Sequence, residues 1–140
     1  METTKDGVFS AKSAYLANIS HDLAPPFQGA WIWKLDVLPK IVNIFWLWMH
    51  KSVPMKNILA TRGIMEDKFC PLCKSLPETI GHLLRDCKYA RDFWHKIKVP
   101  PDAIQSFQVL DVDTWLRENC LSKAMHQSLV PWQYVFPFAI

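Results

Sequence analysis

The sequence lacks the motifs by which many enzymes are recognised. It holds four glycines in 140 residues, and none belongs to a phosphate-binding loop or a Gly-x-Ser-x-Gly nucleophile motif. The nearest approach to a pair of catalytic carboxylates is Asp111-x-Asp113, which helix capping explains more simply. We therefore expect no enzymatic activity, no catalytic residue and no small-molecule substrate.

Long apolar runs and a secretory leader are absent as well. The most apolar stretch, residues 41–49, lies between Lys40 and His50 and is far shorter than the roughly 20 residues that cross a bilayer. The opening residues METTKD have neither the basic region nor the apolar centre of a signal peptide. These features predict no membrane partner, an intracellular location in nucleus or cytoplasm, and cysteines that stay reduced.

Half of the sequence is hydrophobic, with seven tryptophans, but ten prolines interrupt it. This composition predicts a mostly α protein, a small irregular helical domain whose short helices end at prolines. The expected helices are one after the Ser10 cap that stops before Pro25, a buried helix over 40–50 at the centre of the core, and one from Pro54 to the left-handed Gly63.

Apolar residues at helical spacing predict a further helix that ends before Pro100. They are Ala90, Phe93, Trp94 and Ile97. We expect Asp86 to cap this helix, Asp113 to cap a short helix through Leu116, and residues 121–130 to form another helix.

Four residues in the middle of the sequence have the types and spacing of a metal site: Cys70, Cys73, His82 and Cys87. Three thiolates and one imidazole complete a tetrahedral shell around Zn²⁺ and leave no position for water, which is typical of a structural zinc. Two other interpretations stay open: a redox Cys-x-x-Cys pair, which leaves the last two residues unexplained, and four ordinary core residues.

The interval between the last two candidate ligands constrains the local backbone. Five residues of ideal α-helix turn through about 500°, which would point the two side chains about 140° apart. We therefore expect His82 on a short helix that starts near Glu78, a break near Asp86, and Cys87 at the start of the next helix, whose positive end favours its thiolate. Cys120 is expected to be a core thiol, and four other histidines suggest no second metal: His21, His50, His95 and His126.

Several motifs stand together between residue 7 and about residue 95. They are GVFSAKSAY (7–15), WKLDVLPKI (33–41) with Phe45-Trp46, LATRGI (59–64), CPLC (70–73), ETIGHL (78–83) and CKYARDFW (87–94). Together they resemble the reverse transcriptase zinc-binding domain of plant LINE-type, non-LTR retrotransposons and derived genes. The resemblance implies that the family's ligands correspond to Cys70, Cys73, His82 and Cys87.

The resemblance also implies a domain organisation. Residues 1–100 would form the zinc-binding domain of reverse-transcriptase type, and 101–140 a helical C-terminal extension that leads into a nuclease-like domain missing here. The chain would then be a detached fragment of a longer element, without polymerase activity of its own.

The favoured function is a zinc-stabilised accessory module that binds RNA or DNA. The net charge of +3 is mild and no Lys/Arg block occurs, so charge alone names no partner. The candidate nucleic-acid face follows the last predicted ligand and comprises Lys88, Arg91, His95, Lys96 and Lys98. The alternatives are a protein-interaction module that docks through Trp31, Trp33 and Trp48, and a degenerate retroelement fragment with no selected activity.

Overall fold

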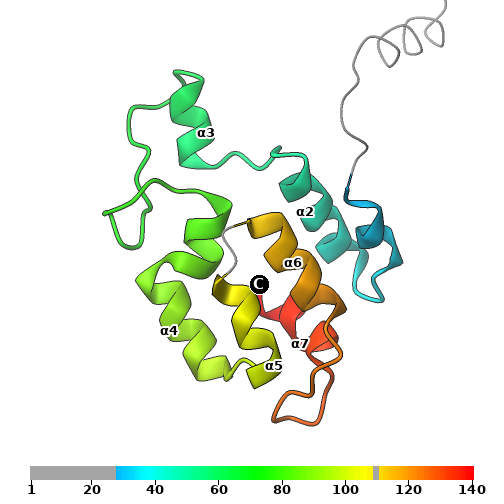
Figure 1. Cartoon of the computed structure of the whole chain (residues 1–140). Coiled ribbons are helices and arrows are strands. Elements are labelled where there is room, and N and C mark those ends of the chain that lie inside the picture. Colours follow the sequence, from blue (N-terminus) through cyan, green and yellow to red (C-terminus); the bar gives the residue numbers. More distant parts are fainter. Residues whose placement is uncertain (1–27, 109–110) are drawn as a thin grey trace, which may run out of the picture.

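The computed structural model describes residues 28–108 and 111–140, and these residues confirm the mostly helical fold class (Figure 1). In chain order the elements are η1 (Ala30–Lys34), α2 (Pro39–Met49), α3 (Lys56–Thr61), η2 (His82–Asp86), α4 (Lys88–Ile97), α5 (Pro101–Ile104), η3 (Gln105–Gln108), α6 (Val112–Leu121) and α7 (Trp132–Ala139). The helix expected after Ser10 lies outside the described residues. Within them, no helix is both long and apolar enough to cross a membrane.

The core is built around the indole of Trp94 on α4. Its ring centroid lies 5.3 Å from that of Phe107, 6.1 Å from Trp115, 6.2 Å from Trp132 and 5.4 Å from Phe136. We call these five side chains the aromatic core; they come from α4, η3, α6 and α7. Most of the pairs meet edge to face, the arrangement that aromatic quadrupoles favour.

A buried amide joins three of these elements. The Asn119 side-chain nitrogen donates to Ser106 Oγ at 2.7 Å and to the Trp115 carbonyl at 2.8 Å. Its oxygen accepts from Trp132 Nε1 at 2.8 Å. Because the amide finds partners for both ends, its burial costs little and fixes α6 against η3 and α7.

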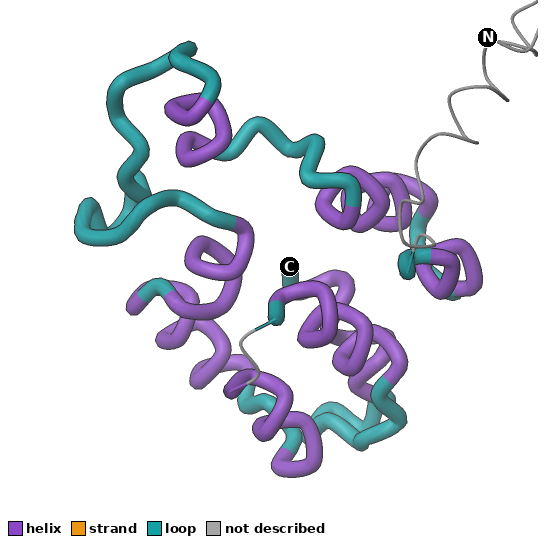
Figure 2. The backbone as a smooth tube through the Cα atoms, turned by 45° about the horizontal axis from the view of Figure 1, so that its top comes forward, coloured by secondary structure: helices purple, strands orange, loops and turns teal. Residues whose placement is uncertain are grey.

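Helix α2 begins at Pro39, one residue before the predicted start, but the expectation that it forms the centre of the core is wrong. It buries Val42 and Phe45, whereas Ile44 is 43% exposed and Leu47 39% exposed. The two views place α2 and η1 to one side of α4, α6 and α7, the helices that supply most of the aromatic core (Figures 1 and 2). An apolar sequence shows that a helix could be buried on several faces, but neighbouring elements decide how many are covered.

Two predicted helix caps are also wrong. The carboxylate of Asp86 accepts from Arg85 Nε at 2.7 Å, and Cys87 occupies the N-cap of α4. Asp111, two residues before the predicted cap, accepts from the backbone N–H of Thr114 at 3.0 Å and caps α6. In the first case the carboxylate pairs with Arg85, and in the second Asp111 takes the capping position.

The left-handed residue predicted after α3 is confirmed at Gly63, with φ +68°. The helix expected over 121–130 is wrong, because α6 ends at Leu121. Residues 122–131 fold back as a loop in which Met125 and Pro131 form a β-bridge and Leu129 has φ +64°. The loop contacts the end of α4 through His126, whose Nε2 lies 2.7 Å from the Ile97 carbonyl oxygen. The chain then enters α7, which was not predicted and contains Pro137.

Candidate metal centre

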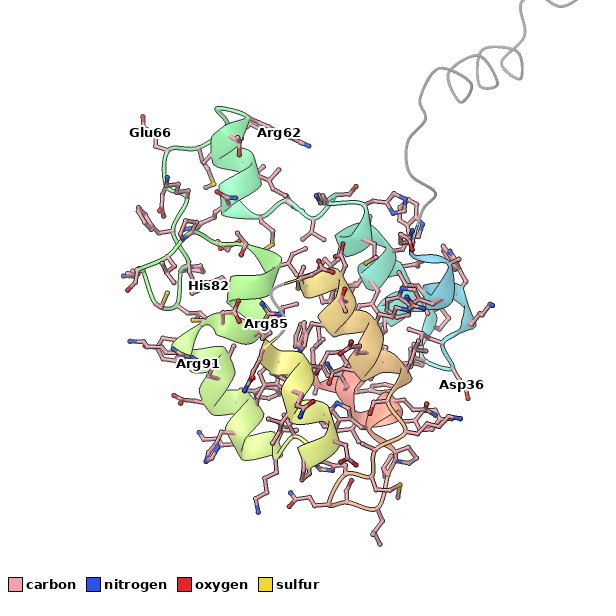
Figure 3. All side chains as sticks on the ribbon, in the orientation of Figure 1. Asp36, Arg62, Glu66, His82, Arg85 and Arg91 are labelled. Atoms are coloured by element: carbon pink, nitrogen blue, oxygen red, sulfur yellow. The ribbon has the colours of Figure 1, made fainter. Side chains whose placement is uncertain are left out.

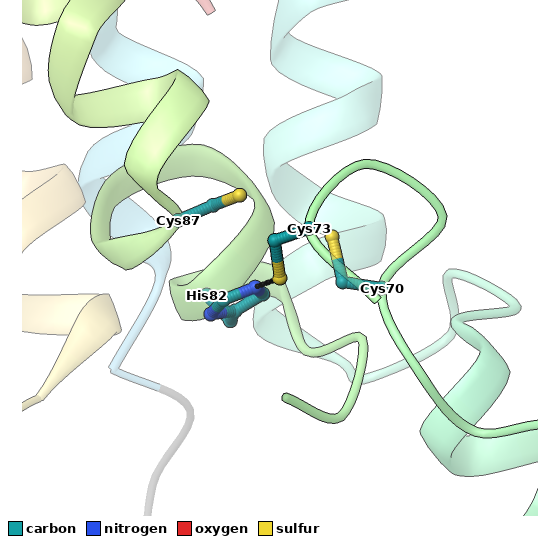
Figure 4. A group of neighbouring side chains, drawn as sticks. All are labelled: Cys70, Cys73, His82 and Cys87. Atoms are coloured by element: carbon teal, nitrogen blue, oxygen red, sulfur yellow. Dashed lines mark hydrogen bonds between the residues drawn. The ribbon is translucent and has the colours of Figure 1, made fainter. Parts of the chain in front are cut away.

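Four donor atoms converge where the sequence predicted a metal site. The Sγ atoms of Cys70, Cys73 and Cys87 and a ring nitrogen of His82 all lie within 4.8 Å of one another (Figure 4). Sulfurs around a tetrahedral zinc lie about 3.8 Å apart, so the donors already have nearly the right spacing. The Cys73 sulfur and His82 Nε2 are 3.1 Å apart, and three of the four residues are buried.

The first two donors are presented by a closed loop. The Glu78 N–H donates to the Lys68 carbonyl and the Cys70 N–H to the Leu76 carbonyl, each at 2.8 Å. Lys74, with φ +55°, turns the chain and returns its N–H to the Cys70 carbonyl at 2.9 Å. These hydrogen bonds make residues 68–78 a knuckle that directs both Cys-x-x-Cys sulfurs to one point.

The other two donors are brought together by a π-helical turn. Element η2 starts at His82, and the Cys87 N–H donates to the His82 carbonyl at 2.7 Å, an i→i+5 bond. Cys87 then leaves helical geometry at φ −58° and ψ 140° before α4 begins. The predicted break after Asp86 is therefore confirmed. The wider turn was not foreseen: it places residues five apart above one another, as an α-helix cannot.

The π turn is anchored to the aromatic core. Trp94 Nε1 donates to the Leu84 carbonyl at 2.7 Å, which satisfies one of the carbonyls that the irregular turn leaves available. The Arg85 side chain is buried, with its guanidinium carbon 5.6 Å from the centre of the Trp115 ring. Packing of α4 and α6 therefore helps to hold His82 and Cys87 in position.

The surroundings give the thiols different acidities. Hydrogen bonds from the backbone N–H of Ser75, and further ones from Leu76 and His82, lower the pKa of Cys73 to about 6. Burial raises the pKa of Cys87, although the Tyr89 N–H at the start of α4 acts in the opposite direction. The predicted effect of the helix end is thus present but weaker than desolvation. A thiolate buried there needs a nearby cation, which the donor set would hold.

Among the described residues, the remaining cysteine and histidines do not belong to this cluster. Cys120 is buried in the core as expected, and burial raises its thiol pKa. His50 contacts the Trp46 carbonyl at 2.9 Å, whereas His21 lies outside the described residues. Across 28–108 and 111–140, no second group of His, Cys, Asp or Glu could hold a metal ion.

The five residues of the predicted nucleic-acid face are all exposed, but they do not form one patch. Arg91, His95 and Lys98 line a groove of about 400 Å³, whereas Lys88 and Lys96 lie outside it. Arg85 also lines the groove; Figure 3 shows it on the π turn and Arg91 on α4. No sequence signal pointed to Arg85, because the π turn places it there.

Fold and site together define a small helical domain with a Cys3His metal-binding cluster. A family model described as zinc-binding in reverse transcriptase matches residues 9–94. The chain therefore belongs to the family of reverse transcriptase zinc-binding domains, which confirms the resemblance seen in its motifs.

One relative extends beyond the region that the family model matches. A protein of Arabidopsis thaliana named "Putative ribonuclease H protein" is 26% identical over 140 residues. The alignment covers 98% of this chain and 22% of that protein, so the chain spans about a fifth of the relative's length. No solved structure matches the chain.

Proposed function

We propose that this chain is a zinc-stabilised, nucleic-acid-binding accessory module of retrotransposon origin. Cys70, Cys73, His82 and Cys87 are its zinc ligands, and it carries out no catalytic step. The observation that carries the proposal is the position of Cys87, which belongs to the donor cluster and is also the N-cap of the helix bearing the basic residues. A metal bound there would fix the start of that helix.

The donor set supports zinc over other common ions. Three thiolates and an imidazole suit a borderline-soft ion with tetrahedral preference, whereas Mg²⁺ and Ca²⁺ take oxygen ligands. Four protein donors fill the shell, so the metal supplies structure and no site for substrate. Structural zinc contributes about 10–16 kcal/mol of apparent binding free energy at neutral pH.

Elemental analysis tests the metal assignment directly. We expect one zinc per chain, and Cys73→Ser should lose it. Cys120→Ala is the matched control, because it removes a cysteine outside the cluster and should keep the zinc. Wild-type protein purified without zinc, and unable to bind it when it is added back, would contradict the assignment.

Salt-dependent binding tests the nucleic-acid assignment. The basic residues Arg91 and Lys98 should contact phosphates, so affinity for labelled RNA or DNA should fall steeply between 50 and 200 mM salt, as counterion release requires. Arg91→Glu should weaken binding, whereas Lys34→Glu on η1 changes the net charge equally and should have a smaller effect. If no single- or double-stranded probe shows salt-dependent binding, the assignment fails.

A second candidate is docking to another protein. Of the three tryptophans proposed for this role, Trp33 is 59% exposed, whereas Trp31 and Trp48 pack against the core. The observation that favours the idea is an apolar groove of about 250 Å³ whose wall includes Ile44 and Phe138. The simplest case of such docking is self-association, which sedimentation of the wild type and of Ile44→Ser tests. If both proteins are monomers at all concentrations, self-association through this groove is contradicted.

A further inference from the structure

We propose that the 400 Å³ groove beside α4 binds one unpaired nucleotide of single-stranded RNA or DNA. The base would lie against Phe107 and Ile104, and its phosphates beside Arg91 and Lys98. This inference rests on the proposed nucleic-acid function and narrows it to a kind of strand and a binding position.

One wall of the groove is apolar and already fixed in place. Phe107 is half-buried, and its ring is held edge to face by Trp94 at 5.3 Å and by Trp115 at 5.4 Å. Ile104 is 47% exposed beside it. Packing a base here would cost little side-chain entropy of Phe107, because the core already holds its ring before anything binds.

The other wall is cationic. Arg91, His95 and Lys98 follow one another at i, i+4 and i+7, so they lie on one side of α4 and its C-cap. Arg85 adds a buried guanidinium that also donates to Asp86 at 2.7 Å. Among the described residues that line the groove there is no carboxylate, and that of Asp86 is paired with Arg85, so Arg91 and Lys98 are the cations available to phosphates.

This combination fits an unpaired nucleotide better than a duplex. In a duplex the faces of the bases are stacked on one another, and mainly phosphates are exposed. An apolar wall would make no favourable contact with those phosphates. A single strand can splay a base onto an aromatic side chain while its phosphates follow adjacent cations. The groove volume lies within the usual range for a small-molecule site, about 300–1,000 Å³.

The larger cleft of the molecule fits less well. It measures about 730 Å³, and its lining includes four carboxylates that would repel phosphate: Glu78, Asp86, Asp111 and Asp113. The difference in lining charge, rather than size, therefore selects the groove beside α4.

The experiment compares strands and variants with the zinc-loaded full chain. Fluorescence anisotropy with a ten-nucleotide single strand and a blunt hairpin duplex, each as RNA and as DNA, should give about tenfold tighter binding of the single strand. Phe107→Leu removes the ring and Ile104→Glu adds a carboxylate to the wall. Each should weaken single-strand binding by about tenfold, the lower part of the range for losing one base stack.

The controls separate groove contacts from folding. Leu38→Glu places the same charge on a side chain of the same 47% exposure at the N-cap of α2, outside the groove, and should leave affinity nearly unchanged. All variants should keep zinc, and the two Glu variants should keep the wild-type melting temperature; Ile104→Glu decides the test if Phe107→Leu does not fold. A 2-aminopurine in the strand should be quenched by wild type and less by Phe107→Leu.

The outcomes distinguish the two proposals. Salt-dependent binding that is equal for both strands, or unaffected by Ile104→Glu, would overturn the groove and leave the nucleic-acid module standing. No salt-dependent binding to any probe would overturn both. A preference for the single strand that both groove variants abolish would support both.

Discussion

Two regions of the described structure are held together by different means. Residues 55–87, which we call the metal lobe, bury Met55 and Arg85 together with three of the four metal-site residues, and in the described structure α3 buries none of its side chains. Residues 88–140 instead surround Trp94 with aromatic rings. Few packed side chains hold the metal lobe apart from those of the donor cluster, so a bound metal would supply there what ring packing supplies in the aromatic core.

Removing the metal should produce the largest difference in stability between the metal lobe and the aromatic core. A chelator should cost the metal lobe most of the roughly 10 kcal/mol that structural zinc contributes, while the aromatic core keeps its packing. Hydrogen exchange should then become fast for the Cys70 and Leu83 amides but stay slow within α6. Equal protection of the lobe with and without chelator would remove the basis of the comparison.

Truncating a core ring should have the opposite pattern. Phe136 is fully buried and stacks on Trp94, so Phe136→Ala should lower the free energy of unfolding by about 3–5 kcal/mol. Urea denaturation measures this loss. Cobalt bound in place of zinc should keep its tetrahedral absorption in the folded variant. Loss of that absorption before unfolding would show that the metal lobe depends on packing in the aromatic core.

The π turn gives a sharper test of the lobe. Deleting Asp86 removes the extra residue that allows the i→i+5 bond from Cys87 to His82, so zinc affinity should fall by about 100-fold or more, as when ligand positioning is lost. Asp86→Asn keeps the chain length and an acceptor oxygen for the buried Arg85 guanidinium, which bonds Asp86 at 2.7 Å. It should bind zinc nearly as wild type does in a competition titration. Equal affinities for the deletion and the wild type would mean that the turn has no role in positioning.

The smallest effect is expected at the α6 cap. Asp111→Ala should lower stability by about 1 kcal/mol at pH 7, whereas Asp113→Ala should remove no cap. Hydrogen bonds from the Thr114 side chain and from backbone N–H groups hold the pKa of Asp111 below its usual value. Its contribution is therefore present above pH about 4 and is lost as the pH falls through the folded-state pKa. Denaturation at several pH values should show the gap between Asp111→Ala and wild type narrowing in acid.

The sequence predicted the metal cluster because ligand types and spacing are local properties. The angle argument for His82 and Cys87 also located the backbone break, since it follows from helix geometry alone. It did not predict the π turn, because the same break can be made in several ways. Trp94 was predicted to face inward from its helical spacing, but its four aromatic partners are distant in sequence and carry no such pattern.

The wrong prediction of the core has a clear physical cause. Apolar content favoured residues 40–50 as the core, yet coverage by neighbouring helices, which no local pattern records, decided burial. The domain boundary at residue 100 stays a prediction. Trp94 contacts Trp115 and Phe136 beyond it, so a chain that ends at residue 100 would show whether residues 1–100 fold alone.

Trp94 and Arg85 take part in both functions proposed here. Trp94 bonds the Leu84 carbonyl of the π turn and lines the groove, and Arg85 lies between His82 and Cys87 and lines the same groove. Because both side chains contact the turn that carries two of the metal ligands, we expect the two binding events to be linked, and such linkage is reciprocal for binding free energies. A strand in the groove should therefore raise the affinity for zinc, measured by competition with a chelator, by the same free energy with which zinc raises the affinity for the strand.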